Sequence, residues 1–179
     1  MTCLVLGVGH PDRGDDAAGH LVASALAEAP GVVARQVTGD PSGILTDPLW
    51  DRADRVVLVD TVRTGRRPGT VHRWAGERLL AHLPDTGGGT HDLGVATTLQ
   101  LAAALERLPE DLVVIGIEGS SFQLGAPPSR PVRHAIAMVS AALARELCGD
   151  DQPRLELALR MTDLAAELPQ DRKVRLEQP

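Results

Sequence analysis

The 179 residues, 43% of them hydrophobic, are enough for one domain with a sizeable core. The formal net charge of −6 argues against a surface that binds nucleic acid or an anionic membrane. Aromatic residues make up 2% of the chain, which also excludes a base-stacking platform. The sequence shows neither a basic N-terminal segment with an apolar stretch nor an apolar run of about 20 residues, so we expect a cytoplasmic protein.

Segments with strand and helix patterns alternate up to about residue 149. The predicted strands cover about 2–8, 32–37, 55–59, 69–74 and 112–117. The predicted helices cover about 15–29, 44–50, 91–107 and 130–147, and a loop is predicted at 84–89. The run at 55–59 is apolar on both faces, which indicates a central strand in a covered sheet.

The connection between the third and fourth predicted strands is too short for a parallel crossover, which needs about a dozen residues or more. The fourth strand should therefore run antiparallel to the third. The sequence thus predicts a three-layer α/β/α fold with a five-stranded, mostly parallel twisted sheet that has one antiparallel strand. Residues 1–149 are expected to form this domain, and 150–179 a C-terminal tail with one possible amphipathic helix at 154–168.

A glycine-rich loop follows the first predicted strand. Gly9 and Gly14 have the spacing of a phosphate-binding loop, but the position of its lysine holds Asp15, followed by Asp16. Two carboxylates in this place repel anions and can attract a cation. We predict that Asp15 caps the helix, which leaves Asp16 available for another task.

Three side chains are predicted at the carboxyl edge of the sheet, where α/β proteins bind ligands. Asp16 follows the first strand, Asp60 ends the third, and His91 opens the helix before the fifth. Two carboxylates and one imidazole suit a divalent metal such as Zn or Ni and leave coordination positions open. Structural roles remain open as alternatives: Asp60 can accept from loop amides, and a single histidine before a helix is more often structural.

Other chemistries find little support. The chain has no Gly-x-Ser-x-Gly elbow, no His-Glu-x-x-His motif and no complete dinucleotide fingerprint. Glu118, just after the fifth strand, is a candidate for lining the cleft. The remaining histidines are assigned to surface or loop positions: His10, His20, His72, His82 and His134.

Four segments, in order, resemble one family, the hydrogenase maturation proteases. The first is Leu-Val-Leu-Gly-Val-Gly-His-Pro-Asp-Arg-Gly-Asp-Asp-Ala-Ala-Gly (4–19), and the second is Val-Val-Leu-Val-Asp-Thr-Val (56–62) with Pro-Gly-Thr (68–70). The third is Thr-His-Asp-Leu-Gly-Val-Ala (90–96), and the fourth is Val-Ile-Gly-Ile-Glu-Gly-Ser-Ser-Phe-Gln-Leu-Gly (114–125). The resemblance covers about residues 3–147.

The resemblance implies a phosphorylase/hydrolase-like fold and an endopeptidase that removes the C-terminal extension of a [NiFe] hydrogenase large-subunit precursor. It also implies that Asp16, Asp60 and His91 recognise nickel carried by that precursor, with Zn or Cd able to occupy the site in vitro. Asp40, in the segment 39–43, would form another wall of the cleft as a second-layer or substrate contact.

The chain departs from the family pattern at His10, where the family usually has Asn. This imidazole can order the loop or add a fourth metal-seeking group. The pattern also leaves open whether the nickel polarises the scissile carbonyl or a carboxylate activates water. A metal-dependent hydrolase of small molecules and a non-catalytic nickel-binding maturation factor are the alternatives. A monomer is expected.

Overall fold

The computed structural model describes residues 1–76 and 93–148. Within these ranges one sheet has five strands: β1 (Cys3–Val8), β2 (Val32–Val37), β3 (Arg55–Val62), β4 (Val71–Ala75) and β5 (Leu112–Glu118). Their order is β2-β1-β3-β5-β4, and every neighbouring pair is parallel except β4 with β5. The predicted sheet is confirmed: β4 runs antiparallel to the direction of β3, although its hydrogen-bonded neighbour is β5.

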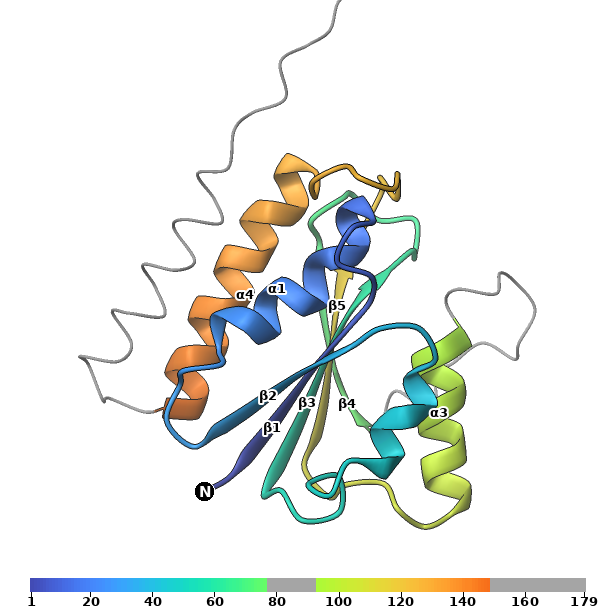
Figure 1. The fold of residues 1–179 in the computed structure, drawn as a ribbon, viewed down its shortest axis with the longest axis vertical. Helices are drawn as coiled ribbons and strands as arrows, with labels where there is room; N and C mark the ends of the chain where they lie inside the picture. Colours follow the sequence, from blue (N-terminus) through green and yellow to red (C-terminus); the bar gives the residue numbers. More distant parts are fainter. Residues whose placement is uncertain (77–92, 149–179) are drawn as a thin grey trace, which may run out of the picture.

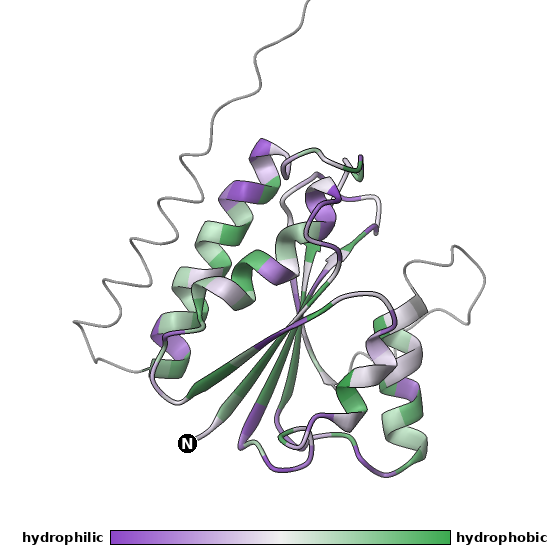
Figure 2. Ribbon diagram, viewed as in Figure 1, coloured by the Kyte–Doolittle hydropathy of each residue, from purple (hydrophilic) through white to green (hydrophobic). Residues whose placement is uncertain are grey.

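Helices cover both faces of this twisted sheet (Figure 1). Helices α1 (Ala18–Ala25) and α4 (Arg130–Cys148) lie on one face, while α3 (Leu93–Ala104) and the 3-10 helix η2 (Pro41–Thr46) lie on the other. Each side has its own cluster of buried apolar side chains. Figure 2 shows the hydrophobic strands enclosed between these layers, as the three-layer prediction requires.

Burial follows the position of each strand in the sheet. All residues of β1 and β5 are buried, whereas β4 alternates between exposed and half-buried residues. Both faces of a central parallel strand are covered, so an unbroken apolar run is favoured there. An antiparallel edge strand with one covered face needs apolar side chains only at alternate positions.

Three predicted helices differ from the structure, and the one predicted to reach residue 107 ends as α3 at Ala104. The one predicted over 15–29 begins as the 3-10 helix η1 (Gly14–Ala17) and continues as α1 only to Ala25. The one predicted over 44–50 is the 3-10 helix η2, which begins earlier, at Pro41. The Asp40 side chain accepts a hydrogen bond from Ser42 N–H at 2.9 Å, and proline suits the first position of a helix because its φ is already helical.

Helix α1 lies directly against β1 because two glycines face each other. A Cβ on Gly7 of β1 would collide with the carbonyl oxygen of Gly19 on α1. A Cβ on Gly19 would collide with the carbonyl oxygens of Val8 and Val59. This close approach fixes the start of α1, and the loop before it, relative to the ends of β1 and β3.

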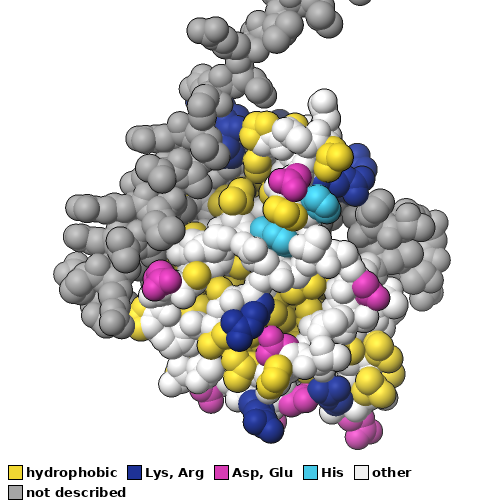
Figure 3. Space-filling model, viewed as in Figure 1, with side chains coloured by type: hydrophobic (Ala, Val, Ile, Leu, Met, Phe, Trp, Pro, Cys, Tyr) yellow, Lys and Arg dark blue, Asp and Glu magenta, His cyan; other side chains and the backbone are white. Residues whose placement is uncertain are grey.

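Four predictions concern segments outside the described residues: the surface or loop position of His82, the loop at 84–89, the helix start at His91, and the tail 150–179. Along 1–76 and 93–148, no helix combines the length and the apolar character needed to cross a bilayer. On the face that Figure 3 shows, the described acidic and basic side chains are scattered among each other and form no continuous basic area.

Candidate active site

A cavity of about 690 Å³ opens at the carboxyl edge of the sheet. It lies where the chain order of the strands reverses: β1 leads through α1 to β2 on one side, and β3 is the neighbour of β1 on the other. Connections leave to opposite faces at such a point, so the sheet edge between them stays open for a ligand. The residues that line the cavity are Val8, Gly9, His10, Arg13, Asp16, Gly39, Asp40, Pro41, Ser42, Asp60, Arg63, Gly94, Val95, Thr97, Thr98, Leu101 and Phe122.

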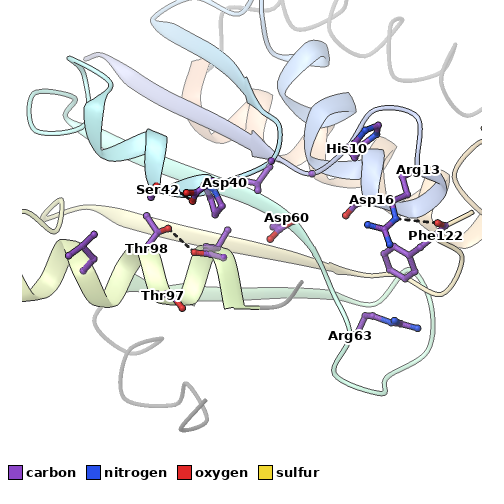
Figure 4. A pocket seen from close by; sticks show the side chains of 17 residues that line it. His10, Arg13, Asp16, Asp40, Ser42, Asp60, Arg63, Thr97, Thr98 and Phe122 are labelled. Atoms are coloured by element: carbon purple, nitrogen blue, oxygen red, sulfur yellow. Dashed lines mark hydrogen bonds between the residues drawn. The ribbon is translucent and has the colours of Figure 1, made fainter. Parts of the chain in front are cut away.

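Asp16 reaches this cavity from the loop that follows β1. Gly9 has φ of 137°, and a Cβ there would collide with the carbonyl oxygen of Asp16. The same carbonyl accepts a hydrogen bond from His10 N–H at 3.2 Å, and Asp16 N–H donates to the backbone carbonyl of Arg13 at 3.2 Å. The loop therefore closes tightly on itself because a glycine permits this backbone conformation, and it directs the half-buried Asp16 into the cavity (Figure 4).

Asp60 reaches the same cavity from β3. In the β1–β3 register Gly7 is opposite Val59, so Asp60 follows at the level where β1 ends. Its Oδ1 accepts a hydrogen bond from Thr61 N–H at 2.7 Å. Figure 4 shows Asp16 and Asp60 projecting into one space from neighbouring segments. The structure thus brings together two of the three side chains that the sequence placed on this edge.

The third, His91, lies outside the described residues. Helix α3, which follows it in sequence, contributes Gly94 and Val95 to the lining of the cavity. Along the described part of the chain, no three side chains among His, Cys, Asp and Glu lie together as a metal-binding group. The ligand set Asp16, Asp60 and His91 therefore stays a prediction.

Asp15 does not cap the helix, so that prediction was wrong. Its carboxylate is fully buried, and Oδ2 accepts from Ser120 N–H at 2.8 Å and from Ser121 N–H at 2.9 Å. Oδ1 accepts from Ser129 N–H at 2.5 Å. Three backbone donors from the β5–α4 loop satisfy this charge, so Asp15 fastens that loop to the loop after β1 instead of serving its own helix.

His10 and Asp40 line the cavity as loop-ordering residues. His10 Nδ1 accepts a hydrogen bond from Asp12 N–H at 3.2 Å. This contact ties the ring to its own loop, in keeping with the loop-ordering role predicted for His10, and the metal-seeking role stays a prediction. The hydrogen bond from Ser42 N–H lowers the pKa of Asp40, which is therefore a carboxylate at neutral pH.

Glu118 is not among the residues that line the cavity, unlike its predicted position. It is buried, and its carboxylate accepts from Thr64 N–H at 2.8 Å, Gly65 N–H at 2.9 Å and Thr64 Oγ1 at 2.8 Å. Burial raises the pKa of Glu118, but the hydrogen bonds lower it by a larger amount, so the net shift of the pKa is downward. Glu118 holds the β3–β4 turn in the way that Asp15 holds the β5–α4 loop.

One histidine assignment also changes. His20 is buried on α1, and its Nε2 lies 3.1 Å from the carbonyl oxygen of Val37. The ring links α1 to the end of β2, so it is neither a surface nor a loop residue.

Arg13, Arg63 and Phe122 are among the cavity residues that the sequence did not single out as candidates. Arg63 Cζ lies 4.8 Å from the centroid of the Phe122 ring, and Arg13 Nε donates to the Phe122 carbonyl at 3.4 Å. Each follows the carboxyl end of a parallel strand (β1, β3 or β5), which was the available signal. Residue type alone gave no reason to choose Arg13 and Arg63 among the 18 basic residues of the chain.

The fold and the cleft place the chain among α/β proteins that bind at the carboxyl edge of their sheet, and solved structures narrow this class. HycI, a [NiFe] hydrogenase maturation protease from Thermococcus kodakarensis KOD1, is 27% identical, with a TM-score of 0.67 over 82% of this chain and 92% of its own. HybD from the same species, also a [NiFe] hydrogenase maturation protease, is 27% identical, with a TM-score of 0.66 over 83% of this chain and 99% of its own. The hydrogenase maturating endopeptidase HybD from E. coli, 22% identical with a TM-score of 0.64 over 82% of this chain and 94% of its own, shares the fold.

The family model HycI, described as hydrogenase maturation protease, matches residues 42–146. No curated protein matches the chain significantly. The chain belongs to the hydrogenase maturation protease family and is an endopeptidase of that family. The resemblance seen in the four sequence segments is thereby confirmed.

Proposed function

We propose that this protein acts in the cytoplasm, as a monomer, to remove the C-terminal extension from a nickel-loaded [NiFe] hydrogenase large-subunit precursor. Asp16, Asp60 and His91 bind the nickel, which belongs to the substrate. The observation that carries the proposal is that Asp16 and Asp60 line one cavity at the reversal point of the sheet. Membership of the protease family supplies the reaction.

The charges of the cavity suit this substrate. Asp16, Asp40 and Asp60 all line the cavity, and carboxylate oxygens attract a divalent metal that the substrate brings. A nickel ion already held by substrate thiolates needs only a few further ligands, and carboxylate and imidazole groups can supply them. Binding the metal then positions the neighbouring peptide for cleavage.

His91 is part of the proposal because of its place in the sequence. It precedes α3 by two residues, and the first turn of α3 contributes Gly94 and Val95 to the cavity. An imidazole there would complete a three-ligand set with open positions, which is typical of catalytic metal sites rather than structural ones.

The experiment compares nickel-loaded and metal-free precursor of the large subunit from the same organism. The purified protein should shorten the loaded form and leave the metal-free form intact, as read by mass spectrometry. Asp16→Asn and His91→Ala should abolish processing while the variants stay folded by circular dichroism. Asp12→Asn, an exposed carboxylate of the same loop, and His134→Ala, an exposed imidazole on α4, are the matched controls. Equal processing of both precursor forms would refute nickel recognition.

A further inference from the structure

One end of the cavity carries two cations around an aromatic ring. Arg13 comes from the loop after β1, Arg63 from the turn after β3, and Phe122 from the loop after β5. Figure 4 shows Arg13 above and Arg63 below the Phe122 ring in that view, with the hydrogen bond from Arg13 to the Phe122 carbonyl drawn as a dashed line. We call these three residues the arginine clamp.

Neither guanidinium of the clamp is neutralised by a carboxylate of the described segments. The ion pairs there involve other arginines; Arg55 and Arg73, for example, share Glu146. Arg13 uses Nε for the Phe122 carbonyl, and its two Nη groups have no acceptor among the described residues. Arg13 is half-buried and Arg63 is exposed, and both line the cavity in a chain of net charge −6.

Buried carboxylates hold the clamp in shape. Asp15 binds the backbone of Ser120 and Ser121, immediately before Phe122, while Glu118 binds the backbone of Thr64, immediately after Arg63. The Phe122 ring in turn supports the Arg63 guanidinium through a cation–π contact. Groups that are fixed before binding lose little conformational entropy when a ligand arrives, so the clamp is prepared for an anion.

The neighbouring carboxylates restrict which anion fits. Asp16 and Asp60 line the same cavity and would repel a strongly charged group such as phosphate. A single carboxylate carries less charge, and its two oxygens match the planar fork of a guanidinium.

We propose that the arginine clamp binds a carboxylate of the peptide that enters the cleft, either an acidic side chain of the C-terminal extension or its terminal α-carboxylate. This inference rests on the proposed function, because it takes the substrate to be the precursor. With the metal at Asp16 and Asp60 and a carboxylate at the clamp, the peptide would be held at two points. The clamp would thus select extensions by charge.

The first test measures binding without cleavage. The probe is a synthetic peptide with the sequence of the precursor's extension, titrated into the full-length protein while the arginine Nε–H signals are followed by NMR. The native peptide should shift the signals of Arg13 and Arg63. A C-terminal amide should remove the effect if the α-carboxylate is bound, and amide forms of the acidic side chains should remove it if they are bound. Equal shifts with a peptide neutralised at both places would overturn the proposal.

The second test uses kinetics on the nickel-loaded precursor. Arg13→Gln and Arg63→Gln should each raise KM about tenfold with little change in kcat, because a charge-assisted hydrogen bond is lost. Arg63→Lys should restore part of the loss. The matched control is Arg66→Gln, an exposed arginine of the same turn that does not line the cavity. A rise in KM for Arg66→Gln equal to that for Arg63→Gln would overturn the proposal.

The two proposals can fail separately. If the wild-type protein processes no precursor, the proposed function fails, and the peptide titration still decides whether the clamp binds a carboxylate. If the wild type processes the precursor and both arginine variants keep its KM, only the clamp proposal fails. Should Arg13→Gln not fold, Arg63→Gln alone decides, because the exposed Arg63 side chain makes no hydrogen bond within the described segments.

Discussion

Asp15 offers a test that separates two structural roles: the helix cap expected from its sequence position, and the fastening of the β5–α4 loop seen in the structure. The change is Asp15→Asn. Asparagine is as good a helix cap as aspartate, so under the capping role this variant should be about as stable as the wild type. Under the loop-fastening role the variant should be clearly less stable than the wild type.

The magnitude follows from the three hydrogen bonds. Oδ2 accepts two backbone N–H groups and Oδ1 accepts one. An amide replaces one oxygen with NH₂, so in either orientation at least one buried N–H faces another donor. A lost hydrogen bond to a charged group costs about 1.5–3 kcal/mol, so the variant should lose roughly 2 kcal/mol of its free energy of unfolding. Asp15→Ala strands all three donors and should lose about 4–6 kcal/mol, a large part of the stability of a typical domain.

Thermal unfolding followed by circular dichroism is the assay. For a chain of this size, a loss of roughly 2 kcal/mol should lower Tm by about 4–8 °C. Asp12→Asn is the control, since it makes the same chemical change three positions earlier at an exposed side chain. A Tm for Asp15→Asn within about 1 °C of the Tm of Asp12→Asn would refute the loop-fastening role of Asp15.

Two further predictions concern backbone contact and pH. Gly19→Ala should lower the free energy of unfolding, measured by urea titration, by about 1–3 kcal/mol, because the new methyl group collides with the Val8 and Val59 carbonyls. Gly43→Ala is the control, since its new methyl group meets no atom within 4 Å and should change the stability little. Equal urea midpoints for the two variants would contradict the close packing of α1 against β1. Because the folded-state pKa of Glu118 lies below its usual value of 4.5, its stabilising contribution is complete above that pH and is lost as the pH falls through the lower folded-state value. The wild type should therefore lose more stability than Glu118→Gln between about pH 5 and pH 3 in urea titrations, and parallel losses would show that the carboxylate contributes nothing there.

Much of the fold could be predicted from the sequence because local patterns specify it. Apolar runs at 3–8, 55–59 and 112–117 mark central strands, and the short link before Val71 sets the direction of β4. Helix starts were less predictable. Pro41 and the capping Asp40 favour an earlier beginning of η2 than the apolar pattern alone suggests.

The candidate site was predictable to the extent that it lies at strand ends. Asp16 and Asp60 were placed on the correct edge, since parallel strands bring their carboxyl ends together whatever their order. Glu118 follows the same rule but points to the β3–β4 turn, where the backbone N–H groups of Thr64 and Gly65 donate to its carboxylate. A strand-end position therefore locates a side chain at the edge without deciding which way it points.

The sequence by itself determined the strands, the mostly parallel sheet, the family, and the position of Asp16 and Asp60 at the edge of the sheet where the cleft lies. These follow from periodicity, loop length and motif order, all of which act over short stretches of chain. The tertiary structure decided the strand order, the fastening of the β5–α4 loop by Asp15, and the pairing of Arg13 with Phe122. The hydrogen bonds of Asp15 and Arg13 with the β5–α4 loop join residues 105 or more positions apart. A buried carboxylate binds whichever donors the folded chain brings to it, and no local pattern specifies those donors.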